Sequence, residues 1–403
     1  MKYDVVVVGA GASGMVAAIK LARGGLKVAL IERQNRGGKK ILASGNGHCN
    51  IANINISPSN FYTKEKSFVG SFLGGYSVAN VIEFFKSIGL EIRAKDDGKL
   101  YPHSMQASAV LNLLEAEIAR LNIDSFYSSS VKQIEAGFRV HLEDAILKAN
   151  SLILATGSMA APTLGGNGSG LEIAQKFGHK ISKQLPALVP LLSKDPICKT
   201  LAGVKHYCRV KLFLNGSEAT SINEDFLFAK YGVSGLAILD ISKDAVMALD
   251  RGLRVDIEVD FFPQINAKEL TSFLKGRIDK KRDLNLKLWL SGIINSKIAN
   301  YILRELNFES LSEARVNSKI VKEIVSRLKA TKIEICGFRE FKYAEVAQGG
   351  VELKDIDAKT MQSKLVKNLY FCGEMLDIIG QRGGYNFYFA WISAFRASKA
   401  ILD

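Results

Sequence analysis

Several features that mark other protein classes are scarce in this sequence of 403 residues. Its five cysteines include no CxxC pair, which argues against a disulfide framework, a zinc site or a redox-active dithiol. No apolar run reaches the length of about 18 residues that a membrane-spanning helix needs. Repeats and low-complexity tracts are absent. We therefore expect a cytoplasmic protein with reduced thiols, no bound metal and no membrane contact.

The start of the chain superficially resembles a secretory signal, because Lys2 precedes an apolar run. Asp4 lies at the beginning of that run, and no small-residue cleavage site follows it, so we expect no leader. The composition, 47% hydrophobic and 23% charged, is typical of a globular chain with two or three domains. The net charge of +14 suits anionic ligands, which include dinucleotides, acidic substrates and nucleic acid.

The N-terminal segment predicts a dinucleotide site. Residues 3–31 read as a buried strand, a turn, a helix and a second strand. Gly9, Gly11 and Gly14 form GxGxxG in the turn, and Glu32 follows the second strand. These glycines permit a tight turn, close approach to a pyrophosphate and close helix packing, while the acid suits a ribose diol. We include three neighbours and a later residue in the predicted site: Ala12, Ser13, Arg33 and Val131.

Two more buried strands, 151–157 and 368–377, end in small residues, and a glycine turn then precedes a final helix over 385–402. FAD is too long for one strand–helix turn, so a second set of residues must hold its ribityl chain and flavin. Several strand ends meeting at one sheet edge therefore favour FAD over NAD. The residues predicted to contribute are Ala155, Thr156, Gly157, Gly373, Glu374, Gly383, Gly384, Tyr385 and Asn386.

The stretch KKILASGNGHCNIAN, residues 39–53, has no hydrophobic period. Together with LPALVPL, the segment GGVELKDIDAKTMQSKLVKNLYFCGEMLD and GGYNFYFAW, it resembles the BaiN-like flavoproteins, also called aminoacetone oxidase-like FAD-binding enzymes. The resemblance covers nearly the whole chain. It implies that the stretch wraps around FAD and that the cofactor site includes Lys39, Ser44, Gly45, Asn46 and Asn50. We add Lys40 as a basic neighbour of the flavin.

The sequence departs from the family pattern at three places. His48 stands where the family usually has arginine, and AKYGVSGL replaces a THxGxSGP-like motif at 229–236. The final helix, which often contains glycine in the family, reads SAFRAS here. The scaffold is thus retained, whereas the substrate chemistry is expected to have changed.

The fold class that we predict is α/β, with a Rossmann-type FAD-binding domain and an inserted substrate domain. The FAD-binding domain is discontinuous, over 1–190 and 343–403. The insertion reads as β-rich over 191–265 and helical over 266–342. We expect substrate recognition by this insertion, since ligand pockets often form where domains meet.

The catalytic candidates are His48, Cys49 and Arg382. A thiol or an imidazole beside the flavin can move protons, and an arginine can clamp a carboxylate. Each has a simpler alternative: Cys49 as a buried packing residue, His48 as a phosphate-facing polar residue, and Arg382 as a turn residue paired with an acid.

We predict an FAD-dependent oxidoreductase that transfers hydride between flavin and a small organic substrate. No second GxGxxG follows a strand, so NAD(P)H is expected only as a transient reductant. A reductase of activated C=C bonds is the first hypothesis, and an amine oxidase that uses oxygen is the second. A tRNA-binding flavoprotein is a third, because LKGRIDKKRDLNLK at 274–287 is rich in cations. The simpler interpretation of this stretch, and the preferred one, is a helix face exposed to solvent. The oligomeric state stays open.

Overall fold

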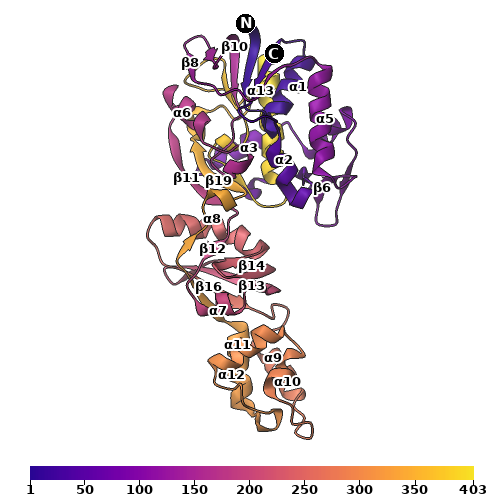
Figure 1. Cartoon of the computed structure of the whole chain (residues 1–403), viewed down its shortest axis with the longest axis vertical. Helices are drawn as coiled ribbons and strands as arrows, with labels where there is room; N and C mark the ends of the chain where they lie inside the picture. The colour runs from indigo at the N-terminus through magenta and orange to yellow at the C-terminus, as the bar shows by residue number, and fades with distance from the viewer. The chain divides into compact units, whose positions relative to one another are not determined.

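The structure, a computed structural model, describes all residues from Met1 to Asp403 and divides into two compact units (Figure 1). The first unit consists of Met1–Leu185 and Val346–Asp403, and the second is Pro186–Glu345. The second unit is therefore inserted into the sequence of the first.

The first unit is built on a sheet whose central strands are parallel. β1 pairs with β2 and β10, β2 pairs with β7, and β10 also pairs with β20. β9 and β8 continue the sheet from β10 in antiparallel fashion. Val5 to Val8 are buried, as expected for a central parallel strand covered on both faces. The strands are β1 (Lys2–Val8), β2 (Val28–Ile31), β7 (Asp124–Phe126), β8 (Gln133–Glu135), β9 (Arg139–His141), β10 (Ile146–Leu154) and β20 (Leu369–Phe371).

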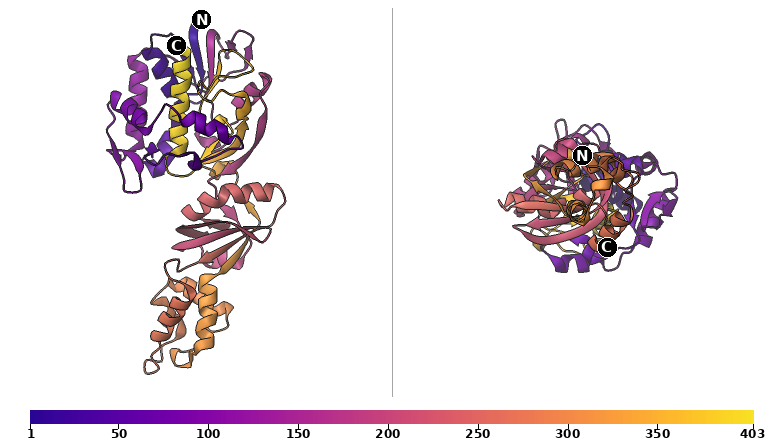
Figure 2. Two further views of the ribbon diagram at one scale, coloured as in Figure 1. Left: turned by 180° about the vertical axis from the view of Figure 1, so that it is seen from behind. Right: turned by 90° about the horizontal axis from the view of Figure 1, so that it is seen from below.

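Helices α1 (Ala12–Arg23) and α13 (Tyr385–Leu402) pack against each other, although they come from opposite ends of the chain (Figures 1 and 2). α13 is buried along most of its length because apolar residues surround the helix on nearly every side. The bounds of α13 match the final helix expected over 385–402. The other helices of this unit are α2 (Lys39–Ala43), α3 (Lys66–Leu73), α4 (Val78–Ser87), α5 (Ala107–Arg120) and α6 (Ser169–Lys176).

Three small sheets complete the first unit. β6 (Lys99–Pro102) lies between β3 (Ala52–Asn53) and β5 (Ile92–Ala94). The other two sheets are pairs, formed by β4 (Phe61–Tyr62) with β21 (Ile379–Gly380) and by β11 (Ile181–Ala187) with β19 (Val346–Val351).

The second unit contains an antiparallel sheet of seven strands in the order β17-β16-β13-β14-β15-β12-β18. Helix α8 (Leu236–Asp250) packs on β13 and β14, so the segment expected to be β-rich also contains a long helix (Figure 2). The short helix α7 (Pro196–Thr200) precedes β13. The strands are β12 (Leu191–Leu192), β13 (Lys205–Leu214), β14 (Ser217–Ala229), β15 (Gly232–Ser234), β16 (Val255–Asp260), β17 (Thr331–Ile335) and β18 (Gly337–Phe338).

Four helices follow β16 and form their own small core. Trp289 and Leu290 are buried there, together with one apolar face of each helix. β17 and β18 then return to the sheet, so the segment expected to be helical, 266–342, ends in strands. The helices are α9 (Ala267–Gly276), α10 (Leu286–Ser291), α11 (Ser296–Glu305) and α12 (Ser318–Lys329).

Candidate functional site

The turn between β1 and α1 has the shape that a phosphate-binding turn requires. Gly9 has a φ of +101°, and a Cβ on Gly14 would lie 1.8 Å from the Gly9 carbonyl oxygen, so both positions need glycine. A Cβ on Gly11, by contrast, would meet nothing within 4 Å. Gly11 precedes α1, whose N-terminus has no side-chain cap. Open space thus lies beside backbone N–H groups that suit a phosphate, with Ala12 and Ser13 in the first turn of α1.

The carboxylate of Glu32 is fixed at the end of β2. One oxygen accepts a hydrogen bond from the Ala10 N–H at 2.9 Å, and the other accepts one from the Gln34 N–H at 2.8 Å. Each carboxylate oxygen can accept a further bond, so a ribose diol remains a suitable partner. Arg33 points elsewhere and donates to the carbonyl of Gly165 at 3.3 Å.

The chain around Val131 also reaches this edge of the sheet. The Ser129 N–H donates to the Glu32 carbonyl at 3.0 Å, and the Ser128 N–H donates to that of Gln34 at 2.9 Å. Val131 is half-buried and packs against the core of the unit. Segments about a hundred residues apart in the sequence are therefore joined beside Glu32.

The ends of β10 and β20 lie at the same edge as the end of β1. The Ala155 N–H donates to the Val8 carbonyl at 2.8 Å, and Thr156 and Gly157 follow it. A Cβ on Gly373 would lie 2.6 Å from the Ser13 hydroxyl, so the end of β20 approaches the start of α1 closely. The predicted residues from these strand ends are thus brought together with the GxGxxG turn.

The stretch from Lys39 to Asn50 forms α2 and a short irregular turn. Gly45 and Asn46 both have positive φ, and the Ser44 hydroxyl donates to the Ile41 carbonyl at 2.6 Å. The ammonium of Lys39 donates to the neutral amide of Gln34 at 2.9 Å, which leaves its charge uncompensated. This places α2 beside the segment that contains Glu32.

The end of this stretch meets the start of α13. A Cβ on Gly384 would lie 2.8 Å from Asn50 Oδ1, and this buried oxygen has no hydrogen-bond partner. Gly384 precedes Tyr385, and the N-terminus of α13 has no side-chain cap. The Asn386 side chain instead braces the turn by bonding both the N–H and the carbonyl of Gly380. The Asn50 side-chain oxygen is thus an unused acceptor, and the first backbone N–H groups of α13 are unused donors.

The residues described above fit a bound FAD. The open space at Gly11, the uncapped starts of α1 and α13, and the unpartnered oxygen of Asn50 are what a long dinucleotide would need.

The catalytic candidates differ in their surroundings. The Cys49 side chain is fully buried, and burial raises the pKa of its thiol to about 12. This environment suits the packing role that the sequence also allowed, and proton transfer by Cys49 stays a prediction. His48 is exposed, and its Nδ1 lies 2.7 Å from the Met105 carbonyl oxygen. Arg382 is half-buried in the turn before Gly383.

Sequence reasoning missed three residues of this region. The buried amide of Asn53 donates to the Gly383 carbonyl at 3.2 Å, Ser158 donates to Glu374 at 2.7 Å, and Gln34 binds Lys39. Asn53 lies inside the stretch 39–53 that resembles the flavoprotein family, and Ser158 follows the predicted Ala155-Thr156-Gly157. Proximity to those motifs was therefore the available signal.

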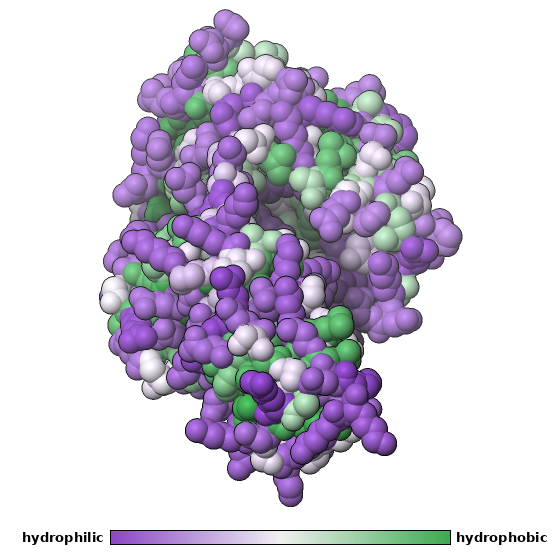
Figure 3. All heavy atoms as spheres, turned by 60° about the horizontal axis from the view of Figure 1, so that its bottom comes forward, coloured by the Kyte–Doolittle hydropathy of each residue, from purple (hydrophilic) through white to green (hydrophobic).

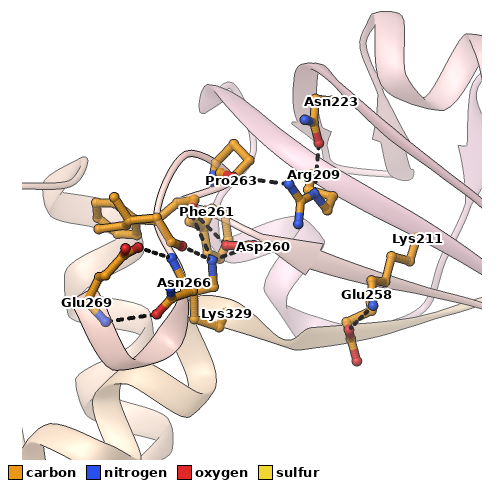
Figure 4. A network of polar contacts seen from close by, with 12 residues as sticks. Arg209, Lys211, Asn223, Glu258, Asp260, Phe261, Pro263, Asn266, Glu269 and Lys329 are labelled. Atoms are coloured by element: carbon orange, nitrogen blue, oxygen red, sulfur yellow. Dashed lines mark hydrogen bonds and ion pairs between the residues drawn. The ribbon is translucent and has the colours of Figure 1, made fainter. Parts of the chain in front are cut away.

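The second unit contains a groove of about 470 Å³ between its sheet and α9 (Figure 4). Its charged groups bind one another: Lys329 lies 2.6 Å from Asp260, and Lys211 lies 3.9 Å from Glu258. Arg209 donates to Asn223 and to the Pro263 carbonyl. We interpret these polar contacts as the packing interface between the sheet and the helices.

No group of three or more His, Cys, Asp and Glu side chains is placed to hold a metal ion in this chain. No single helix has both the length and the apolar character of a membrane span. By length and composition only, the bent pair of α3 and α4 passes that test.

Comparison with known proteins identifies the class. Residues 3–400 match the family described as the HI0933-like protein Rossmann domain. The chain belongs to this family of FAD-dependent oxidoreductases, which confirms the α/β fold class and the resemblance to BaiN-like flavoproteins.

Two relatives match along nearly their whole length. The 3-dehydro-bile acid delta(4,6)-reductase of Clostridium scindens is 31% identical, over 98% of both chains. The ribosomal RNA dihydrouridine synthase of Escherichia coli is 28% identical, over 100% of this chain and 98% of the relative. Among solved structures, 3-ketosteroid-Δ4-(5α)-dehydrogenase from Rhodococcus jostii has a TM-score of 0.52 at 15% identity, with 100% of this chain and 97% of that chain covered. This last similarity concerns the fold.

Proposed function

We propose that this protein is an FAD-dependent reductase of carbon–carbon double bonds conjugated to a carbonyl group, with NAD(P)H as a transient reductant. The observation that carries the proposal is the full-length similarity to two proteins whose names describe the same bond change. A delta(4,6)-reductase saturates a C=C bond, and dihydrouridine is uridine with its ring C=C bond saturated. Bound FAD would supply hydride transfer.

We propose that this chain holds FAD through the residues brought together at the sheet edge. Glu32 would accept bonds from the adenosine ribose, and the first N–H groups of α1 would bind the pyrophosphate. Asn50 and the start of α13 would face the flavin end. Positive charge at Lys39 and the helix N-terminus would favour anionic partners.

The second unit supports a transient role for NAD(P)H. A resident nicotinamide domain would need a parallel sheet with its own glycine-rich turn. The sheet of the second unit is antiparallel throughout. NAD(P)H would therefore visit the flavin and leave before the substrate is reduced.

A steady-state assay tests this proposal. The purified holoenzyme should oxidise NADH or NADPH in proportion to the amount of a conjugated enone that is saturated, measured by mass spectrometry. Peroxide release from aminoacetone and oxygen, without nicotinamide oxidation, would instead establish the amine oxidase that the sequence also allowed.

A second candidate substrate is the uracil ring in RNA. Its ring C=C bond is also conjugated to a carbonyl, and the relative from Escherichia coli is named for that product in ribosomal RNA. The specific observation in favour is the charge of the helical part of the second unit, which carries half of the net charge of the chain. Incorporation of two hydrogens into uridine of RNA, detected by nucleoside mass spectrometry, tests it.

A further inference from the structure

The helices of the second unit concentrate positive charge. Residues 266–330 contain fourteen lysines and arginines but only seven acids, a net charge of +7. Three of these cations form ion pairs: Arg282, Arg304 and Lys329. The other eleven form none, so most of this charge is not compensated within the chain.

Four of the uncompensated lysines lie where α9 turns into α10. We define this basic corner by Lys275, Lys280, Lys281 and Lys287, all of which are exposed. Two acids lie in the same turn. The Asp279 carboxylate is paired with Arg282 at 3.5 Å, and the exposed Asp283 accepts from the Ala314 N–H at 3.4 Å and forms no ion pair with the four lysines. The repulsion among the lysines therefore persists in the free protein and would be relieved by a polyanion.

The basic corner is held by contacts that do not use its lysines. The Arg277 guanidinium lies 5.2 Å from the Trp289 ring centre and donates to the Trp289 carbonyl at 3.1 Å. The Trp289 indole N–H donates back to the Arg277 carbonyl at 3.3 Å. Glu313, which is fully buried, accepts from the Asp279 N–H at 2.7 Å and from Arg282 at 3.0 Å. The four lysines thus lie exposed on a turn whose conformation is fixed by other residues.

Two exposed apolar side chains flank the corner. Phe273 is 49% exposed and Leu288 is 62% exposed. In Figure 3, hydrophilic residues cover most of the visible surface, and apolar residues form smaller patches among them. Two separate apolar side chains among lysines suit contact with nucleotides better than insertion into a lipid surface, which needs a continuous apolar face.

We propose that the basic corner binds the phosphate backbone of an RNA substrate. This inference rests on the second candidate under the proposed function. The lysines would neutralise phosphates and release counterions, which supplies affinity without reading the sequence. Phe273 would offer one ring face to an unpaired base.

Binding of a fluorescein-labelled RNA hairpin with a uridine-rich loop to the holoenzyme, followed by anisotropy over a salt series, tests the proposal. The variant K275Q/K280Q/K281Q/K287Q should bind at least roughly tenfold more weakly, and its salt slope should be less steep by about 3. A control with equal charge change removes four exposed lysines of the first unit: Lys66, Lys86, Lys176 and Lys180. The control should keep most of the affinity and slope.

Equal losses in the two quadruple variants would overturn the proposal, because net charge alone would then explain binding. Binding to phosphatidylglycerol vesicles but not to RNA, lost in F273S/L288S, would also overturn it and assign the corner to a membrane surface. Enone reduction by NAD(P)H is measured separately. RNA binding without enone reduction would contradict the proposed reductase alone, whereas reduction without RNA binding would contradict this inference alone.

Discussion

The Lys40 ammonium lies 2.8 Å from the Glu374 carboxylate, although 334 positions separate the two residues. The other oxygen of Glu374 accepts from the Ser158 hydroxyl at 2.7 Å and from the Ala347 N–H at 3.1 Å. One carboxylate thus joins α2, the end of β10, β19 and the end of β20. These are segments that the proposed FAD site needs in fixed positions.

We predict that Lys40→Met lowers the free energy of unfolding by about 1 kcal/mol, as expected for a partly buried ion pair. FAD retention on desalting should fall as well, because Glu374 would lose the partner that anchors α2. Lys399→Met is the matched control, since the Lys399–Asp403 pair is largely exposed. Equal effects of the two substitutions would contradict this role of Lys40.

Glu32→Ala should weaken FAD binding by about 1.5 to 3 kcal/mol, the cost of losing hydrogen bonds to a charged group. The bound flavin should keep its absorption spectrum, because the ribose lies far from the ring. Titration of apoprotein with FAD, followed by flavin fluorescence, measures the loss. Glu32→Gln, which keeps an acceptor for Ala10, should lose less. Unchanged affinity in Glu32→Ala would place the ribose elsewhere.

Two glycines of one turn should respond differently to the same substitution. Gly11→Val should leave the fold intact, since its Cβ meets nothing within 4 Å, but should abolish FAD retention by filling the space for the pyrophosphate. Gly14→Val should prevent folding, because its Cβ would lie 1.8 Å from the Gly9 carbonyl oxygen. Circular dichroism and flavin content separate the two results. Full FAD retention in Gly11→Val would refute the pyrophosphate position.

The local parts of the fold could be predicted from the sequence. The strand, glycine turn and helix at the N-terminus depend on neighbours in the chain, and so does the final helix from Tyr385. The family match then confirmed the fold class. Helix α8 was not predicted, because apolar and polar residues alternate clearly in the strands on either side of it. That alternation led to a β-rich interpretation of the whole segment.

The pairings inside the candidate site could not be predicted. Lys40 with Glu374 and Asn53 with Gly383 join positions more than 300 residues apart. A local pattern of apolar and polar residues cannot predict such contacts, because they depend on the packing of the complete unit. The burial of Cys49 also depends on the packing of the complete unit, and the short segment around it has no apolar pattern that would predict it.

Buried thiols should make the protein less stable at high pH. Burial raises the pKa of Cys49 from 9.0 to about 12, and it raises that of Cys198 to about 11. Below pH 9 both folded and unfolded thiols are protonated, so the stabilisation is complete. Above that value the unfolded thiols ionise first, so stability falls toward pH 12. Urea unfolding across this range should show a smaller decline in Cys49→Ala, whereas Cys336→Ala, at an exposed site, should follow the wild type.

The most direct test of the proposed reductase is an anaerobic stopped-flow record of flavin absorbance. NADH or NADPH should bleach the bound flavin, and a conjugated enone should then restore the colour far faster than oxygen does. Absence of bleaching with either nicotinamide, together with rapid bleaching by aminoacetone and prompt recovery in air, would contradict the reductase.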